Sequence, residues 1–225
     1  MTRAAECRGV GGLGGPACFA CGGGGLGAGV TGRFVVLLQA TYLEKGFAMR
    51  FCVFGSSSAN LDSMYINAAI GLGSELASRG HGLVFGGYDT GLMGAVAKGA
   101  ASENGHIIGI VTEGLNALGR DIFPCTEVIC TPDMAVRKER MMELSDAYIA
   151  MPGGLGTLDE LFVVLSKVKA GEMNCKSAIL NVGGFYDKMI EQLDYMTETG
   201  LNSSNWRDIC GVFDNAAELV DWLEK

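Results

Sequence analysis

The sequence predicts an α/β protein built on a doubly wound parallel sheet with helices on both faces. Short apolar runs of strand length alternate along the chain with longer stretches of helical period. The runs are apolar throughout, as is typical of parallel strands that are buried on both faces. Glycine-rich turns follow three of these strands, at the sheet edge where such folds bind ligands.

Residues 1–48 are predicted to be a disordered extension outside the fold. They contain 13 of the 35 Gly. Such a segment has few side chains to bury, and ordering its backbone costs much conformational entropy. The segment lacks the Leu-rich core and cleavage site of a signal peptide. Composition changes at Met49, and residues 49–225 are expected to form one domain. One hypothesis is that Met49 is the natural start and that the extension is an artefact of gene-start assignment.

From Met49 onward, the expected elements follow one another in a regular order. The apolar runs predict strands at residues 50–54, 82–85, 106–111, 127–130, 147–151 and 177–181. The stretches of helical period predict helices at about 61–79, 133–144, 157–170, 185–199 and 216–224. A further helix is predicted to follow the turn 86–94 and to end at about residue 103. Gly80 ends the first helix, as glycines commonly do.

Composition excludes several classes of function. The formal net charge is −8, which argues against a nucleic-acid partner, although a few local donors can still hold one small anion. No apolar run approaches the roughly 20 residues that a membrane span needs. The eight Cys are scattered and read as reduced, so a cytoplasmic protein is expected. Cys18 and Cys21 form a lone CxxC, and with two His in the chain no metal site is expected.

The segment Pro152-Gly-Gly-Leu-Gly-Thr-Leu-Asp-Glu160 is the strongest candidate for a binding site. It follows a strand and opens a helix, so its glycines let backbone N–H groups approach a ligand beside the free donors of the helix terminus. A phosphate is the natural guest, with Thr157 and Glu160 beside it. The alternative is a tight turn whose acidic first turn merely suits the helix dipole. It is neither a P-loop nor a GxGxxG motif.

Three further segments are ambiguous when each is taken alone. Met134-Ala-Val-Arg137-Lys138 offers a guanidinium suited to phosphate or carboxylate, but its neighbouring charges also fit a solvated helix face. Gly55-Ser-Ser-Ser58 and Gly86–Gly94 either approach a ligand or serve packing alone. His81 and His106 each stand at a predicted strand start, which favours ordinary structural roles over catalysis.

Taken together, these motifs resemble the Lonely Guy family of cytokinin riboside 5′-monophosphate phosphoribohydrolases, also called lysine decarboxylase-like. The resemblance runs from about Arg50 to Glu224. The matching motifs are Gly55-Ser-Ser-Ser58, Gly86-Gly-x-x-x-Gly-Leu-Met-Gly94, Met134-x-x-Arg137-Lys138 and Pro152-Gly-Gly-x-Gly-Thr-x-x-Glu160. The last two are the specific ones, with 23 residues from Arg137 to Glu160.

The resemblance implies a Rossmann-like domain, a homodimer and a small-molecule nucleotide substrate, with no cofactor or metal. The implied reaction is hydrolysis of the N-glycosidic bond of AMP or of N6-modified AMP, which releases the free base and ribose 5-phosphate. Arg137 and Glu160 would be the catalytic pair, because a carboxylate can stabilise an oxocarbenium-like ribose and orient water. The residues expected to bind the 5′-phosphate are Gly153, Gly154, Gly156 and Thr157. The other residues expected in the substrate site are Lys138, Asp121, Gly55, Ser56, Gly86, Gly87 and Met134.

The sequence departs from the family at two places. The family's Pro-Arg-Glu-Ile stretch, whose acid contacts the nucleotide, reads Gly119-Arg120-Asp121-Ile122, and the carboxyl of Asp121 is one methylene closer to the backbone. The helix after Glu160 reads Leu165-Ser-Lys-Val-Lys-Ala170 where the family usually has a Trp. Because both regions shape the base pocket in the family, the preference between adenine and isopentenyl-type bases stays open.

Two other functions compete with hydrolysis. Related folds include molybdenum-cofactor carriers, so a non-catalytic nucleotide or cofactor carrier is the first alternative. The older family name suggests a pyridoxal-phosphate decarboxylase, but no recognisable cofactor pocket surrounds a Schiff-base Lys in this sequence. Arg137 and Glu160 favour the hydrolase.

Overall fold

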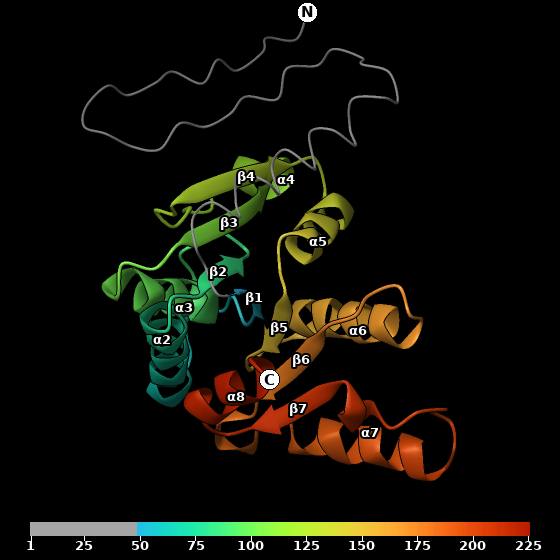
Figure 1. The fold of residues 1–225 in the computed structure, drawn as a ribbon. Helices are drawn as coiled ribbons and strands as arrows, with labels where there is room; N and C mark the ends of the chain where they lie inside the picture. Colours follow the sequence, from blue (N-terminus) through green and yellow to red (C-terminus); the bar gives the residue numbers. More distant parts are fainter. Residues whose placement is uncertain (1–48) are drawn as a thin grey trace, which may run out of the picture.

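The computed structural model describes residues 49–225, which form a seven-stranded, all-parallel sheet with helices on both faces (Figure 1). The predicted fold class is confirmed. In chain order the strands are β1 (Arg50–Phe54), β2 (Gly82–Phe85), β3 (Ile107–Thr112), β4 (Glu127–Thr131), β5 (Ala147–Ala150), β6 (Lys176–Leu180) and β7 (Cys210–Phe213). The predicted extension at residues 1–48 lies outside the described residues.

The helices connect these strands and carry the site. They are α2 (Ser63–Ser78), α3 (Gly91–Ser102), α4 (Glu113–Ala117), α5 (Met134–Glu143), α6 (Leu155–Lys169), α7 (Asp187–Glu198) and α8 (Ala216–Leu223), with 3-10 turns at Val182–Gly184 and Trp206–Asp208. The sequence did not predict β7 or α4. β7 is a four-residue edge strand that contains Gly211 and is mostly half-buried, whereas α4 is a five-residue helix that buries no side chain.

The order of the strands creates a crevice at the centre of the sheet. Neighbouring strands follow the order β4-β3-β2-β1-β5-β6-β7, so the chain first builds outward from β1 to β4. It then returns to the other side of β1 and continues from β5 to β7. Connections that leave β1 and β5 therefore diverge to opposite faces, and the crevice between them lies beyond the carboxyl ends of the strands.

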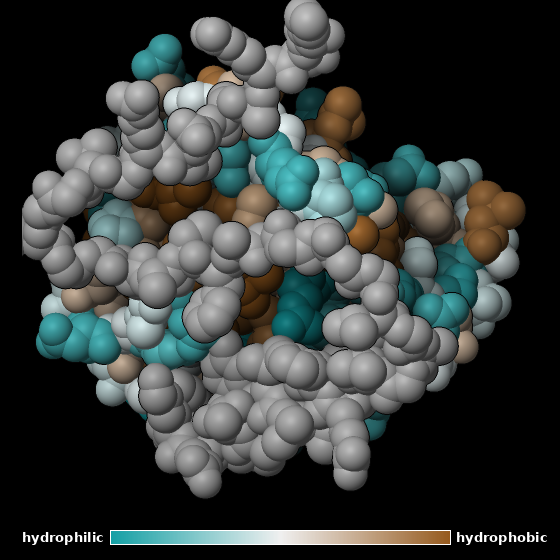
Figure 2. Space-filling view, turned by 90° about the horizontal axis from the view of Figure 1, so that it is seen from above, coloured by the Kyte–Doolittle hydropathy of each residue, from teal (hydrophilic) through white to brown (hydrophobic). Residues whose placement is uncertain are grey.

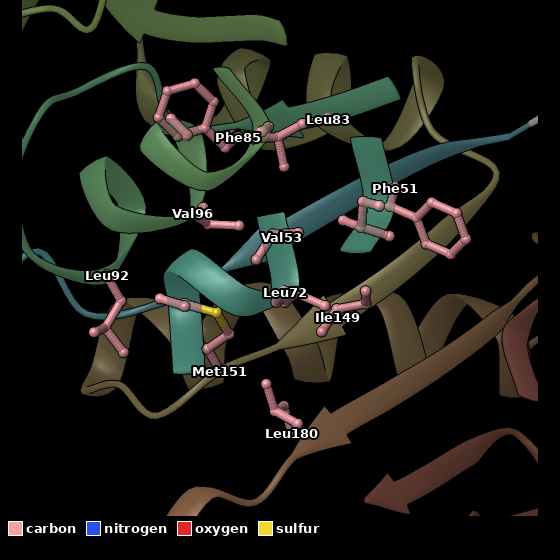
Figure 3. Packing of buried hydrophobic residues seen from close by; sticks show 14 of the residues in the cluster. Phe51, Val53, Leu72, Leu83, Phe85, Leu92, Val96, Ile149, Met151 and Leu180 are labelled. Carbon is pink, nitrogen blue, oxygen red and sulfur yellow. The ribbon is translucent and has the colours of Figure 1, made fainter. Parts of the chain in front are cut away.

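Alternate side chains of the strands build a core on each face of the sheet. Phe51 and Val53 pack with residues of α2, α3 and α8, and Figure 3 shows strand side chains gathered around Leu72 of α2. Cys52 and Phe54 point the other way and pack with residues of α5 and α6. This alternation follows from the two-residue period of a strand. Both faces are therefore sealed by helices, which explains why the strands are apolar throughout.

Helices α2 and α3 approach each other through glycines. A Cβ at Gly73 of α2 would lie 2.0 Å from the carbonyl oxygen of Val96, and one at Gly99 of α3 would lie 2.0 Å from that of Ile70. No other residue fits at either position without moving a backbone. The close contact holds α3, and with it the turn that precedes α3, in a fixed place over the sheet.

The two histidines lie at the amino ends of the strands, away from the crevice at the carboxyl ends. His81 is buried, with Nε2 2.7 Å from Oε1 of Glu224 in the last turn of the chain. His106 is also buried, with Nε2 3.2 Å from Oε1 of Glu127. Each precedes the strand whose amino end it adjoins, so both connect structural elements away from the crevice.

Among residues 49–225, the cysteines at positions 52, 125, 175 and 210 carry free thiols. No helix in this part of the chain combines the length and apolar character that crossing a bilayer takes. Nor do the described side chains bring three or more potential metal ligands together. On the face viewed from above, hydrophobic and hydrophilic residues lie side by side where the described residues are visible (Figure 2).

The close contact of α2 and α3 yields a stability test with an internal control. Gly73→Ala should lower the free energy of unfolding by about 1–3 kcal/mol, because the new methyl group overlaps backbone atoms of α3. Gly71→Ala on the same helix meets no atom within 4 Å and should raise stability by up to about 1 kcal/mol through helix propensity. Urea unfolding of both variants measures the difference. Equal effects would contradict the packing described here.

Candidate active site

A cavity of about 610 Å³ occupies the crevice at the carboxyl ends of the strands. The segments that follow each of the first five strands all contribute to its wall. The lining residues are Gly55, Ser56, Ser57, Ser58, Tyr88, Met93, Leu115, Arg120, Met134, Arg137, Gly154, Leu155, Gly156, Thr157 and Glu160. A cavity of this size accommodates a ligand as large as a nucleotide.

Main-chain hydrogen bonds through Ser56 connect the turns around the cavity. The N–H of Ser56 donates to the carbonyl of Pro152 at 3.1 Å, and the N–H of Leu92 donates to the carbonyl of Ser56 at 2.8 Å. Gly91 has a φ of +55°, and a Cβ there would lie 2.4 Å from the same Ser56 oxygen. The turns after β1, β2 and β5 are therefore fixed relative to one another, and the glycine is required at position 91.

The amino end of α6 faces the cavity with its backbone open. Gly154 is the N-cap and provides no side-chain cap, so the first N–H groups of α6 lack helical acceptors. A Cβ at Gly154 or Gly156 would meet no protein atom within 4 Å, whereas one at Gly153 would lie 2.1 Å from Oγ1 of Thr157. Gly153 thus makes room for the buried Thr157, and the other two glycines leave the donors accessible. An anion is the natural ligand for such a terminus.

Tyr186 supports this turn from below. Its buried hydroxyl donates to the carbonyl of Met151 at 2.9 Å. Burial raises the pKa of this phenol, and a hydrogen bond from the backbone of Gly153 partly opposes that shift. Tyr186 therefore stays neutral near pH 7 and holds the glycine-rich turn through its hydroxyl. Tyr186 precedes α7, far along the chain from the segment 152–160, so the sequence of that segment could not identify it as a support.

Arg137 is buried at the first turn of α5 and fixed by two contacts. Its side chain is 5% exposed, its Nε donates to the carbonyl of Ile110 at 2.8 Å, and its Nη1 lies 3.3 Å from Oε1 of Glu160. A Cβ at Gly86 would lie 2.2 Å from Nη2 of Arg137, so the glycine after β2 leaves space for the guanidinium. A buried cation with one carboxylate and one carbonyl as acceptors is held in a single orientation.

Glu160 stands in the second turn of α6 with its side chain 13% exposed. Burial raises its pKa above the usual glutamate value, and the charge of Arg137 opposes this shift. The neighbouring Asp159 raises the pKa further, while Lys138 and the hydrogen bond from Arg137 lower it. The carboxylate therefore sits in a partly dry site where its charge acts strongly on anything placed beside it.

The structure gathers eight of the predicted site residues around this one cavity. These are Gly55, Ser56, Met134, Arg137, Gly154, Gly156, Thr157 and Glu160. Five others lie outside its lining: Gly86, Gly87, Asp121, Lys138 and Gly153. Gly86 and Gly153 instead make room for Arg137 and Thr157, as described above.

The remaining three of these five have other contacts. The ammonium of Lys138 lies 2.7 Å from Oδ2 of Asp159. Asp121 has an exposed side chain, and its carbonyl accepts from the N–H of Asp89 at 2.9 Å. Gly87, with a φ of +81°, accepts from the N–H of Phe123 at 2.9 Å. These main-chain bonds attach the segment after α4 to the turn after β2.

Sequence reasoning missed several residues of the cavity wall. Tyr88 donates its hydroxyl to Oδ1 of Asn116 at 2.9 Å, and the guanidinium carbon of Arg120 lies 5.8 Å from the centre of the Tyr88 ring. Tyr88, Met93 and Arg120 all fall within segments that had been singled out, so treating whole segments as candidates would have found them. Leu115 belongs to the unpredicted α4, and no pattern in the sequence marks it.

Comparison with known proteins relates this chain to a family of enzymes. Residues 93–223 match the family model described as "Possible lysine decarboxylase". A cytokinin riboside 5′-monophosphate phosphoribohydrolase of Arabidopsis thaliana is 39% identical over 190 residues, which cover 84% of this chain and 87% of the relative. A second Arabidopsis protein of that name is 40% identical over 177 residues, covering 78% and 82%.

Solved structures of similar shape are more distant in sequence. A molybdenum cofactor binding protein from Rippkaea orientalis superimposes with a TM-score of 0.61 at 20% identity, covering 78% of this chain and 94% of that chain. A molybdenum cofactor carrier protein from Chlamydomonas reinhardtii gives 0.58 at 20% identity, covering 78% and 95%. At this level of identity the likeness shows a common fold alone.

The surroundings of Glu160 predict how its carboxyl titrates. Its pKa should lie above the usual glutamate value, and Arg137→Met should raise it further by removing the cation that favours the charged form. NMR observation of the side-chain carboxyl carbon across a pH series measures both values. Because the folded-state pKa is raised, ionisation of Glu160 costs stability, which is lost as pH rises through that pKa. A wild-type pKa at or below the usual value would contradict this description.

Proposed function

Because the chain belongs to the Lonely Guy family of cytokinin riboside 5′-monophosphate phosphoribohydrolases, we propose that it hydrolyses the N-glycosidic bond of a purine nucleoside 5′-monophosphate. The products are the free base and ribose 5-phosphate. One observation carries the proposal: the buried Arg137–Glu160 pair and the uncapped end of α6 face the same cavity. An anion site and a desolvated carboxylate that face one cavity suit a phosphorylated sugar.

The 5′-phosphate is assigned to the amino end of α6. Gly154, Gly156 and Thr157 line the cavity there, and the helix terminus contributes donors and the positive end of its dipole. Ser56, Ser57 and Ser58 line the cavity as well and add hydroxyl and backbone donors. These groups can hold one phosphate despite the net negative charge of the chain. Binding there places the ribose against the first turns of α6, beside Glu160.

Glu160 is the proposed catalytic carboxylate. As the bond between C1′ and the purine nitrogen breaks, the electron pair leaves with the base and positive charge develops on the ribose. The Glu160 carboxylate stabilises that charge and orients a water molecule toward C1′. The water oxygen bonds to C1′, one proton of the water is transferred to the departing base, and ribose 5-phosphate remains. Because this role needs the ionised form, the raised pKa of Glu160 limits turnover on the acid side.

Arg137 is proposed to orient Glu160 and the nucleotide. Its guanidinium is fixed to the carbonyl of Ile110 by one hydrogen bond and pairs with Oε1 of Glu160. The pairing keeps Glu160 in place and lowers its pKa, which partly offsets the effect of burial. A carboxylate held within a few tenths of an ångström is worth far more to a reaction than a free one.

The base is assigned to the part of the cavity wall that comes from outside α6 and includes several apolar side chains. Tyr88, Met93, Leu115 and Met134 line the cavity outside α6, and all but Tyr88 lack polar side-chain groups. A purine or an N6-linked hydrocarbon suits such a surface. We therefore propose AMP and its N6-modified, cytokinin-type forms as the substrate class. Arg120 stands beside Tyr88 and is available to a planar base.

The other two functions receive less support. A pyridoxal-phosphate decarboxylase needs a lysine for its Schiff base, and no lysine is among the residues that line the cavity. A cofactor carrier needs no catalytic carboxylate, and the likeness to carrier proteins extends to the fold alone. Free base and ribose 5-phosphate appear only if the chain is a hydrolase.

Glu160→Gln should lower the kcat for hydrolysis of AMP or N6-isopentenyl-AMP by at least about 100-fold. The affinity for AMP should change far less, because the amide keeps the shape of the side chain. Chromatography of the free base measures turnover, and calorimetry measures binding. Glu143→Gln, which removes a carboxylate from an exposed pair with Arg140 on α5, serves as the matched control and should keep wild-type turnover. Near-normal turnover of Glu160→Gln would reject the proposed role.

We also propose a homodimer in the cytoplasm. Large apolar side chains are exposed on the two helices that border the cavity, with Met134 of α5 45% exposed and Leu155 and Phe162 of α6 87% and 36% exposed. An apolar surface of this kind marks a contact site more often than free solvent. The free thiols of Cys52, Cys125, Cys175 and Cys210 suit a reducing compartment.

Sedimentation should therefore give about twice the 23.6 kDa mass of the chain. Phe162→Glu should shift the protein toward the monomer, because it places a charge within the apolar surface. Leu201→Glu changes another large apolar residue, 80% exposed and located after α7, and should leave the dimer intact. A wild-type monomer, or a dimer that Phe162→Glu leaves unaltered, would contradict this interface.

A further inference from the structure

Two ion pairs lie next to each other between α5 and α6. The inner pair joins Arg137 to Glu160 at 3.3 Å, and the outer pair joins Lys138 to Asp159 at 2.7 Å. Arg137 and Lys138 are consecutive on one helix, as are Asp159 and Glu160 on the other. The inner pair is buried at the cavity, while the side chains of Lys138 and Asp159 are 24% and 55% exposed.

Lys138 also lies near Glu160. The two side chains line a small crevice with the apolar Phe54, Met142 and Val163, and Glu160 lines both this crevice and the larger cavity. The ammonium of Lys138 has three donors on a flexible stem and can reorient when a partner is removed. Its present partner is Asp159, next to Glu160 on α6.

Few charged groups act on Glu160, and they shift its pKa in opposite directions. Arg137 and Lys138 of α5 lower its pKa, whereas Asp159 on its own helix raises it. Cys52 of β1 also interacts with Glu160, and burial, followed by the charge of Glu160, raises the pKa of its thiol well above the usual value, so the thiol stays neutral. Asp159 is thus the single described acid that acts on Glu160 in this way, and it acts in two ways, by its own charge and by engaging Lys138.

We propose that Asp159 is a positioning residue for the hydrolysis: it holds the ammonium of Lys138 on the outer surface and away from the Glu160 carboxylate. Without Asp159, the ammonium turns inward and pairs with Glu160. A carboxylate paired with a second cation has less negative charge to offer a developing oxocarbenium ion and less freedom to orient water. The inference rests on the proposed function of Glu160.

Asp159→Asn tests this directly. The pKa of Glu160 in the unliganded variant should fall by about 1 or more, because a cation within about 4–6 Å favours the charged form. The acid limb of kcat should move to lower pH, and kcat at its plateau should fall several-fold with little change in KM. The side chain of Asp159 is largely exposed and of the same size as Asn, so the variant should fold as the wild type does.

The second substitution separates reorientation of Lys138 from the mere loss of a negative charge. If Lys138 turns inward, Lys138→Met should raise the pKa of Glu160 more in the Asp159→Asn background than in the wild type. The double variant should then recover most of the turnover that Asp159→Asn loses. Strictly additive effects on the pKa, or a double variant no better than Asp159→Asn, would overturn the proposal.

Two controls keep the outcome distinct from that of the proposed function. Glu143→Gln frees Arg140 on the outer surface of α5 and should leave both the pKa of Glu160 and kcat unchanged. NMR titration of Glu160 needs no substrate, so it reports the movement of Lys138 even if AMP is not hydrolysed. Absence of hydrolysis by the wild type would reject the proposed function, whereas an unchanged titration in Asp159→Asn would reject this inference alone.

Discussion

The site depends on keeping one carboxylate charged inside the protein. Removing a carboxylate from water costs several kcal/mol unless a partner and hydrogen bonds compensate. Arg137 provides that partner for Glu160, and Arg137 is itself held by the carbonyl of Ile110 and by the space that Gly86 leaves open. The fold thus supplies the partner before any ligand arrives, and a charge held in this way can act on a developing cation without waiting for water to rearrange.

The order of the strands explains why these groups meet. Arg137 opens the helix after β4, Gly86 follows β2, and Glu160 lies on the helix after β5. The order in which strands are added switches to the other side of β1 after β4, and the segments after all of these strands meet at the crevice beside that point. The main chain of Ser56 then ties the turns together, so the anion site on α6 and the carboxylate keep a constant separation.

Much of this could be predicted from the sequence, since the first six strands are apolar runs and most helices have a clear period. The edge strand β7 was not predicted because it has four residues, of which three are half-buried and one of these is a glycine, and such a short run gives little signal. The contact of Arg137 with Glu160 could be suspected only from the family resemblance, because the two residues are 23 positions apart in the sequence and meet only in the folded chain. The pairing of Lys138 with Asp159 could not be predicted at all, since it depends on how α5 and α6 are rotated against each other.

A crystal structure of the Glu160→Gln variant with AMP bound tests the central claim most directly. The account predicts the 5′-phosphate among the backbone N–H groups of residues 154–157, with C1′ of the ribose facing the side chain at position 160 and the base toward Leu115 and Met134. A phosphate held elsewhere, or a ribose turned away from position 160, would contradict it.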